Sequence, residues 1–360
     1  MKIVTIVGAR PQFIKASVVS HLFAQDDEIE EILIHTGQHF DNNMSEVFFH
    51  QMGIPEPKYN LEVQGGHHGY MTGRMMEKIE EILLVEKPNF VLVYGDTNST
   101  LAGALAAKKL KIKVIHVEAG LRSFNDDMPE EVNRIITDRV SSILFFPTEA
   151  ARENLENEGF PFDGQKLVKC GDVMFDASLA FSAKAERVSR ILDDLSLEPQ
   201  NFVLSTLHRA ENTDSEERLR SIVNSLNDLN KKFPVVLPIH PRTRKKLQEY
   251  KIELKVKTTD PVGYLDMLML LKNCRFVMTD SGGVQKEAYF FEKPCLTLRD
   301  ETEWRELVEF GYNRICGASE ELIATVADEY LSKNIQFKKG IYGDGHAANE
   351  IKKGIINYVK

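Results

Sequence analysis

Short apolar runs that end in polar or glycine-containing turns recur along the first 150 residues. They read IVTIVGARP, EILIHTGQH, FVLVYGDTNST, VIHVEAGLR and SILFFPT. Each run has the length and the apolar character of a strand that is buried on both faces of a parallel sheet. Helical patterns lie between them, at residues 100–110 with Thr100 as a cap, at residues 129–142 with Pro129 in the first turn, and at residues 148–159. This alternation predicts a doubly wound α/β sheet.

The same pattern restarts after the turn-rich stretch GFPFDGQK. New apolar runs read FVLSTLHR, VVLPIHP, RFVMTDSGG and PCLTLRD, and helical stretches such as DSEERLRSIVNSLNDLNKK and YLDMLMLLKNC separate them. We therefore expect a second α/β domain of similar size. The two domains are expected to face each other across a cleft, because ligands of α/β proteins usually bind near the carboxyl ends of strands.

Composition and charge exclude several classes of function. The chain has 360 residues, of which 42% are hydrophobic and 28% are charged, so it is long enough for two separate cores. A net charge of -9 without a long basic block argues against a nucleic-acid partner. The four cysteines are about twenty or more residues apart, which excludes paired zinc and redox motifs and favours reduced thiols. The first apolar run is too short for a signal peptide or a membrane span, so we expect a cytoplasmic protein without a membrane partner.

The stretch TDSGGVQKEA, residues 279–288, places two glycines between an apolar strand and a helix. Ser281, Gly282 and Gly283 would stand at the helix start, where free backbone N–H groups and the helix dipole favour a phosphate. Glu287 lies about one and a half turns into the helix, within reach of a ribose. A tight turn without a ligand and a solvated acid are the alternatives for these positions.

The turn after the first strand, VGARPQFIK, contains a single glycine. It therefore lacks the dinucleotide fingerprint and does not indicate a nicotinamide cofactor. Arg10 and Lys15 could supply phosphate contacts from this turn, although basic residues near a strand end are often only solvated.

Two carboxylates follow apolar strands directly. Asp96 and Glu118 end the runs VYGDTNST and IHVEAGLR, and neighbouring parallel strands would bring both acids to one edge of the sheet. Glu130 and Glu131 follow Pro129 in the first turn of the next helix, with Arg134 at i, i+4 from Glu130. The alternative for these two acids is structural, because acids in a first turn stabilise the helix dipole and Glu–Arg pairs stabilise the helix.

Histidines also end strands in the second half of the chain. His208, with Arg209 beside it, could donate to a phosphate or move a proton, although a single His is more often structural. His240 has the same strand-end placement. Five further histidines lack the spacing of a metal site, so we expect no catalytic metal. They are His35, His39, His67, His68 and His116.

Eight motifs together resemble the non-hydrolysing UDP-N-acetylglucosamine 2-epimerases, in the same order over nearly the whole chain. They are GARPQFIK, GQHF, YGDTNST, HVEAGLRS, MPEEVNR, GDVMFDA, LHRAEN and TDSGGVQKEA. The resemblance implies a glycosyltransferase-B-like architecture of two Rossmann-like domains, at residues 1–168 and 169–341, with a C-terminal helix at residues 342–360 that packs back on the first domain. It also implies that the second domain holds most of the UDP and that the protein is a homodimer.

Members of that family invert C2 of a UDP-sugar without net redox chemistry. UDP is eliminated to give a 2-acetamidoglucal and is added again after protonation on the opposite face, so the resemblance implies no cofactor and no metal. It gives acid/base roles to Asp96, Glu118 and Glu130, and makes His208 the partner of the phosphate or leaving group. The ligand contacts that it implies are Arg10, Lys15, Arg134, Ser281, Gly282, Gly283 and Glu287. Arg209 and His240, at the strand ends described above, complete the expected substrate contacts.

Departures from the family pattern concern the substrate. Where the common pattern reads T-E-R-P-E, this chain has TEWRE, with Trp304 at the arginine position and Arg305 at the proline position. The segment QGGHHGYMTGRMM also lacks the pattern of members that a second substrate molecule activates. These features resemble the branch that acts on UDP-2,3-diacetamido-2,3-dideoxyglucuronate, and UDP-N-acetylglucosamine stays open beside it.

Three other functions stay open. A hydrolysing epimerase would add water instead of UDP to the glycal, a glycosyltransferase could share the two-domain frame, and a UDP-sugar sensor would only bind. The sensor is disfavoured because binding alone does not require Asp96, Glu118, Glu130 and His208.

Overall fold

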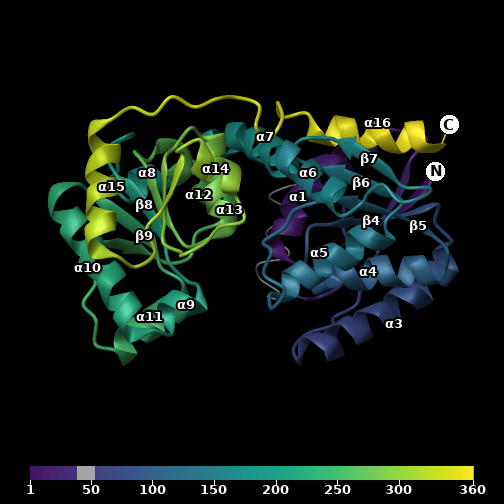
Figure 1. The fold of residues 1–360 in the computed structure, drawn as a ribbon, viewed down its shortest axis with the longest axis horizontal. Coiled ribbons are helices and arrows are strands. Elements are labelled where there is room, and N and C mark those ends of the chain that lie inside the picture. The colour runs from purple at the N-terminus through teal and green to yellow at the C-terminus, as the bar shows by residue number, and fades with distance from the viewer. Residues whose placement is uncertain (39–52, 360) are drawn as a thin grey trace. The chain divides into compact units, whose positions relative to one another are not determined.

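The chain forms two compact units, Met1–Ala177 together with Lys339–Lys360, and Ser178–Lys338 (Figure 1). The computed structural model describes residues 1–38 and 53–359, and the backbone but not the side chain of Arg10. Within these residues each unit has a parallel sheet and helices in alternation, which confirms the predicted α/β class. The expected cleft between the two domains stays a prediction.

The sheet of the first unit has the strand order β3-β2-β1-β4-β5-β6-β7, and neighbouring strands are parallel. Val4, Ile6 and Val93 of its central strands pack against Met75 and Ala104 of two helices, and none of these side chains is exposed. The strands are β1 (Lys2–Val7), β2 (Glu30–His35), β3 (Tyr59–Asn60), β4 (Phe90–Tyr94), β5 (Lys113–Val117), β6 (Ile143–Phe146) and β7 (Lys166–Lys169). The helices are α1 (Arg10–Phe23), α3 (His68–Glu86), α4 (Asn98–Lys109), α5 (Pro129–Val140), α6 (Glu149–Asn157) and α16 (Ala347–Val359).

The sheet of the second unit has the strand order β10-β9-β8-β11-β12-β13, again with parallel neighbours. Its core includes Leu237, Met278 and Leu296, which pack with Leu219 and Ile222 of a helix. The strands are β8 (Val203–Thr206), β9 (Val235–Pro238), β10 (Lys257–Thr259), β11 (Val277–Thr279), β12 (Cys295–Thr297) and β13 (Asn313–Ile315). The helices are α8 (Ile191–Asp194), α9 (Ala210–Thr213), α10 (Glu216–Lys232), α11 (Pro241–Glu249), α12 (Tyr264–Asn273), α13 (Gly282–Phe290), α14 (Arg305–Glu309) and α15 (Glu320–Ser332).

The predicted strands and helices are found at the expected places, and two details differ. The sequence pattern missed the short strands β3, β7, β10 and β13, because each has only two to four residues and contains polar residues. Helix α4 begins at Asn98, with the side chain of Thr97 rather than that of Thr100 as its cap, because Thr97 accepts a hydrogen bond from the Thr100 N–H.

The chain passes between the two units inside helix α7 (Val173–Val188) and again near Lys339. The predicted boundary between residues 168 and 169 falls within β7, whose last residue, Lys169, still pairs with Phe146. Helix α16 packs on α1 of the first unit, where Ile351 and Ile355 are fully buried. Among the described helices, none is both long and apolar enough to cross a membrane.

Candidate functional site

The carboxyl ends of β4 and β5 carry the two predicted catalytic carboxylates. The strands are parallel neighbours, and Tyr94 pairs with Val117, so Glu118 follows one strand directly and Asp96 follows the other after Gly95. This placement is the one that a parallel sheet requires, because the carboxyl ends of its strands meet at one edge. The sequence prediction that both acids lie on one edge of the sheet is therefore confirmed.

Glu118 stands in a backbone conformation that side chains rarely adopt, with φ at 76°. The N–H groups of Glu118 and Ala119 both donate to the carbonyl oxygen of Phe145, at 3.0 Å each, and hold the chain in this turn. The Glu118 carboxylate forms an ion pair with the Lys15 ammonium of α1, and the exposed fractions of the two side chains are only 7% and 12%. A strained, well-anchored backbone at a strand end is typical of functional sites.

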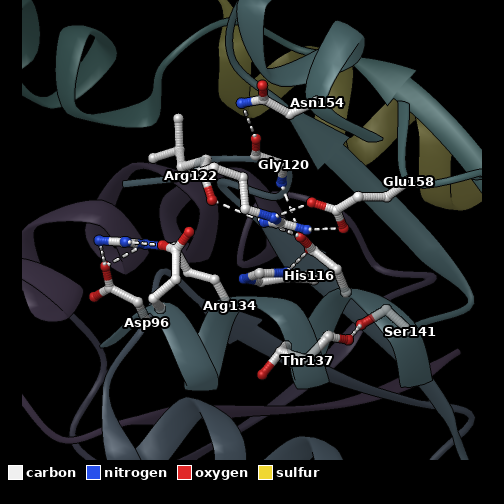
Figure 2. Close-up of polar contacts among 12 residues, drawn as sticks. Asp96, His116, Gly120, Arg122, Arg134, Thr137, Ser141, Asn154 and Glu158 are labelled. Atoms are coloured by element: carbon white, nitrogen blue, oxygen red, sulfur yellow. Dashed lines mark hydrogen bonds and ion pairs between the residues drawn. The ribbon is translucent and has the colours of Figure 1, made fainter. Parts of the chain in front are cut away.

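Asp96 is held by Arg134 of α5, as Figure 2 shows. The Arg134 guanidinium donates to Oδ2 of Asp96 from Nε at 3.0 Å and from Nη2 at 2.6 Å. Its Nη1 donates at 2.7 Å to Glu131, a buried carboxylate that also accepts hydrogen bonds from the N–H groups of Ser123 and Phe124. Burial by itself would raise the pKa of Glu131, but these donors hold that pKa below its ordinary value. Arg134 thus links Glu131, which backbone N–H groups hold in place, to Asp96 beyond the carboxyl end of β4.

Glu130 does not pair with Arg134 in the structure. The side chain of Glu130 is exposed, whereas Glu131 and Arg134, three residues apart, lie on the buried side of α5. The sequence interpretation of a Glu130–Arg134 pair is therefore wrong, because the turn of the helix presents Glu131 and not Glu130 to that side. The catalytic role of Glu130 stays a prediction.

In the second unit, His208 is oriented by a buried carboxylate. Asp280 follows β11, has no exposed surface, and lies with Oδ1 at 3.0 Å from Nδ1 of His208. The backbone N–H groups of His208 and Arg209 also donate to Asp280, at 2.9 Å each. Burial would raise the pKa of Asp280, but His208 and the backbone donors hold that pKa below its ordinary value. The His208 side chain keeps 40% of its surface exposed, so it is both fixed and accessible.

His240 lies close to His208, with ring centroids 5.8 Å apart. It caps α11, because its Nδ1 accepts a hydrogen bond from the Arg242 N–H at 3.2 Å. An accepting Nδ1 carries no proton, so the proton of a neutral His240 ring is on Nε2. Burial, together with the neighbouring His208 and Arg242, lowers the pKa of His240 below its ordinary value.

The Ser281 turn starts α13 as predicted. The Ser281 side chain caps the helix by accepting from the Val284 N–H, and Gly283 is exposed with open space where a Cβ would stand. At Gly282 a Cβ would come within 2.1 Å of a Glu303 carboxylate oxygen, so a larger residue here would require the Glu303 side chain to move. The Trp304 indole N–H donates to the Gly282 carbonyl at 2.8 Å.

Comparisons with known proteins decide the family. The sequence profile of UDP-N-acetylglucosamine 2-epimerase matches residues 21–356. This chain belongs to that family. The Pseudomonas aeruginosa UDP-2,3-diacetamido-2,3-dideoxy-D-glucuronate 2-epimerase is 56% identical to it over 98% of each chain.

Solved structures agree with this family. The Methanocaldococcus jannaschii UDP-GlcNAc 2-epimerase, in complex with UDP-GlcNAc and UDP, is 43% identical, with a TM-score of 0.89 over 99% of this chain and 100% of that one. The Neisseria meningitidis UDP-GlcNAc 2-epimerase bound to UDP-GlcNAc is 31% identical, with a TM-score of 0.88 over 99% and 100%. The predicted family, its isomerase class and its fold class are confirmed.

For this epimerase, the roles of the individual side chains stay predictions. The structure brings Asp96 together with Arg134, and Lys15 together with Glu118, in the first unit. In the second unit it brings His208 near His240 and places Glu287 buried in α13. The prediction for Arg10 concerns a side chain outside the described part of the structure, and His39 also lies outside it. Within residues 1–38 and 53–359, no cluster of three or more His, Cys, Asp and Glu side chains could hold a metal ion.

Sequence reasoning missed Gln12, which organises the turn after β1. Its side chain is buried, and Oε1 accepts hydrogen bonds from the N–H groups of Gly8 and Ala9 at 2.8 and 3.1 Å. Its Nε2 donates to the Tyr94 carbonyl and to the Thr100 hydroxyl. Gln12 therefore occupies backbone donors that bind phosphate in dinucleotide-binding folds. The only signal in the sequence was a polar residue between Pro11 and the apolar pair Phe13 and Ile14.

Proposed function

We propose that this chain is a non-hydrolysing 2-epimerase that inverts C2 of UDP-2,3-diacetamido-2,3-dideoxy-D-glucuronate. The observation that carries the proposal is the pair of carboxylates at the ends of neighbouring strands, Asp96 and Glu118, each held by a cation. The substrate is favoured by the 56% identity to the Pseudomonas aeruginosa enzyme that carries this name.

Two positioned carboxylates suit the chemistry of this reaction. Inversion at C2 requires that a base removes the C2 proton on one face of the sugar and that an acid returns a proton on the other face. The C1–O bond breaks in the same reaction, so UDP leaves as an anion and must be stabilised until it is added again. No atom is oxidised or reduced overall. We propose Asp96 and Glu118 as the acid/base pair, with Glu130 as a third carboxylate.

The remaining predicted residues are proposed as substrate contacts. In the first unit these are Arg10, Lys15 and Arg134. In the second unit we propose that the Ser281–Gly283 turn at the start of α13 binds the diphosphate, that Glu287 binds the ribose, and that His208, Arg209 and His240 contact the departing phosphate. The fixed orientation of His208 on Asp280 and its exposed ring support this role.

UDP-N-acetylglucosamine is the second candidate substrate. The solved Methanocaldococcus jannaschii enzyme, bound to UDP-GlcNAc and UDP, shares 43% of its sequence with this chain over nearly the full length. Assaying both UDP-sugars side by side separates the candidates. We expect a kcat/KM at least about tenfold higher for the diacetamido uronate, and the reverse preference would overturn the choice of substrate.

Incubation in heavy water without any acceptor tests the reaction itself. The proposed mechanism puts deuterium at C2 of the recovered substrate and of its epimer, because the C2 proton exchanges with solvent in each turnover. A hydrolysing enzyme would accumulate UDP in proportion to product, and a transferase or sensor would leave the C2 hydrogen in place. Mass spectrometry of the UDP-sugars and NMR of C2 read out these outcomes.

Asp96→Asn and Glu118→Gln test the roles of the carboxylates. Each change keeps the shape of the side chain and removes its acid/base function, so we expect kcat to fall by about 10²–10⁴ with UDP affinity largely kept. Asp228→Asn serves as the control, because Asp228 forms an exposed pair with Lys231 on α10. A wild-type rate in either carboxylate variant would remove that residue from the mechanism.

We also propose that the chain works as a homodimer in the cytosol. Its four cysteines are free and buried, as is usual for proteins of a reducing compartment. Light scattering after size-exclusion chromatography measures the mass in solution, and a monomer at assay concentration would contradict the dimer.

A further inference from the structure

An ionic network with a buried centre lies next to the two predicted catalytic carboxylates. Its centre is Asp138 of α5, which has no exposed surface and accepts hydrogen bonds from three donors. These are His116 Nδ1 at 2.7 Å, the Gly120 N–H at 3.1 Å and Arg122 Nη1 at 2.8 Å. Arg122 in turn makes two parallel hydrogen bonds to Glu158, at 2.6 and 2.8 Å, which Figure 2 shows.

The hydrogen bonds of His116 define its protonation. Nδ1 faces the Asp138 carboxylate, and Nε2 faces the carbonyl oxygen of Gly95 at 2.8 Å. Both partners can only accept, so both ring nitrogens must donate and the ring is an imidazolium. The buried Asp138 carboxylate thus lies between two buried cations, His116 and Arg122, and Arg122 also pairs with Glu158, whose side chain is 35% exposed. Each buried charge has an opposite charge beside it, as burial of charge requires.

The charged groups around His116 come from several elements. Asp138 faces it from α5, Arg122 lies across Asp138 in the loop after β5, and Glu158 follows α6. Glu118 and Lys15 also lie close to Gly95, because a Cβ added to Gly95 would stand 3.2 Å from Glu118 Oε2 and 3.3 Å from Lys15 Nζ. Burial would raise the pKa of Asp138, but His116 and Arg122 hold that pKa below its ordinary value.

This network holds the turn that carries Asp96. The Gly95 carbonyl accepts from His116, the Gly95 N–H donates to Val117 O at 3.0 Å, and the residue has a φ of 61°. The next residue is Asp96, whose own carbonyl accepts from Asn133 Nδ2 at 2.8 Å. Without the His116 contact, the carbonyl of the peptide that joins Gly95 to Asp96 would lose this hydrogen bond, and only the Gly95 N–H would keep its partner.

The same network brackets Glu118. His116 precedes it by two residues and Gly120 follows it by two, and both donate to Asp138. Asp138 therefore fixes the chain on either side of the strained Glu118 backbone. Displacements of about 1 Å in a catalytic group can cost on the order of 10²-fold in rate.

We propose that His116 and Asp138 are positioning residues for Asp96 and Glu118: an imidazolium held between Asp138 and the Gly95 carbonyl sets the turns on which both carboxylates stand. This inference rests on the proposed epimerase function. His116 does not reach the substrate in this role, and it acts through Gly95 and through the strand that carries Glu118.

Two substitutions at His116 separate its two hydrogen bonds. The amide nitrogen of Asn matches the place of Nδ1, whereas that of Gln matches the place of Nε2. We expect His116→Asn to lose the Gly95 contact and to lower kcat about 10²-fold, with KM and UDP affinity within about threefold. His116→Gln keeps a donor for Gly95, and we expect its kcat to stay within about tenfold of wild type.

Glu86→Gln is the matched control. Glu86 is a buried carboxylate of the same unit that pairs with Lys2 and Lys58 away from the carboxyl ends of β4 and β5. Its loss should lower the melting temperature and leave kcat unchanged. If His116→Asn and His116→Gln keep the wild-type kcat, or lose it equally and in proportion to their melting temperatures, the positioning role is refuted.

NMR of protein with ¹⁵N-labelled histidine tests the imidazolium without any assay. The chain has 10 histidines, and the signals that vanish in His116→Gln identify the ring of His116. Under the conditions of the activity assay we expect a proton on both of its nitrogens, as its two hydrogen bonds require, and a nitrogen without a proton would overturn the proposal. If the wild-type chain shows no C2 exchange in heavy water, the epimerase function fails and the positioning role fails with it. Exchange in wild type with unaffected variants refutes the positioning role alone.

Discussion

At the scale of single residues, buried carboxylates rather than surface charges define the candidate site. Asp280 has no exposed surface, and its oxygens accept from the His208 ring and from two backbone N–H groups. An isolated carboxylate at this place would be costly, whereas one with several donors keeps its charge and fixes its neighbours. Asp138 follows the same rule in the first unit.

Asp280→Asn should therefore destabilise the protein in a way that depends on pH. The pKa of Asp280 is lowered in the folded state, so the stability from its charge is present above the unfolded pKa of about 3.9 and is lost as the pH falls through the folded value. We expect the variant to be less stable by about 1.5–3 kcal/mol at pH 7. Urea unfolding at pH 7 and near pH 3 measures this difference, which should narrow at the lower pH. A difference that does not change with pH would contradict the charged role of Asp280.

At the scale of elements, buried polar side chains along one side of helix α5 hold the loops that follow β4 and β5. Glu131 holds the loop at Ser123 and Phe124, Arg134 holds Asp96, and Asp138 holds His116. These three helix residues are spaced by three and four positions, so they lie along one side of the helix. An amphipathic helix usually turns apolar residues inward, and here the inward polar side chains connect the loops after β4 and β5 to one helix.

Helix α16 gives an element-scale prediction. A Cβ at Gly354 would come within 2.6 Å of the Phe145 ring of β6, so Gly354→Ala forces the ring or the helix to move. We expect a loss of about 1–3 kcal/mol, the usual cost of overpacking a core. Gly73→Ala in α3 is the control, because nothing lies within 4 Å of its added Cβ and alanine is the better helix former by up to about 1 kcal/mol. Thermal unfolding of both variants measures the change in stability, which should be a loss for Gly354→Ala and a small gain for Gly73→Ala. Equal changes in the two variants would contradict the tight packing at Gly354.

At the scale of the whole molecule, the two units differ in how the chain builds them. The second unit is one continuous stretch, Ser178–Lys338, whereas the first needs the C-terminal segment. That segment is tied to the first unit by the Asp176 carboxylate, which accepts from the Ala347 and Ala348 N–H groups, and by the Lys352–Asp26 ion pair at 2.6 Å. The first unit is therefore complete only after the segment Lys339–Lys360 has been synthesised.

Truncation after Lys338 should act on the two units differently. It removes α16 and exposes the apolar surface of the first unit that Ile351 and Ile355 cover. We expect the unfolding transition of the first unit to be lost or strongly lowered, while the second unit keeps its own. Calorimetry with limited proteolysis distinguishes the units, and a fragment of residues 178–338 provides the reference transition. A truncated chain with both transitions unchanged would contradict the role of α16.

Much of this protein was readable from its sequence by itself. The alternation of apolar runs and helical patterns determined both α/β units, because a buried parallel strand needs apolar residues on both faces. The same pattern predicted that Asp96, Glu118 and His208 lie where strands end. The ordered motifs indicated the family. These are local features, and the residues that produce them are neighbours in the chain.

Only the tertiary structure decided how the polar side chains pair. Arg134 reaches Asp96 across 38 residues, Gln12 reaches Tyr94 across 82, and His116 meets Asp138 on another element. Such pairs depend on which strands are neighbours and on which side a helix turns inward, so the spacing in the sequence does not reveal them. The choice between Glu130 and Glu131 as the partner of Arg134 is one position along a helix, about 100° of rotation, and packing against the sheet sets that rotation.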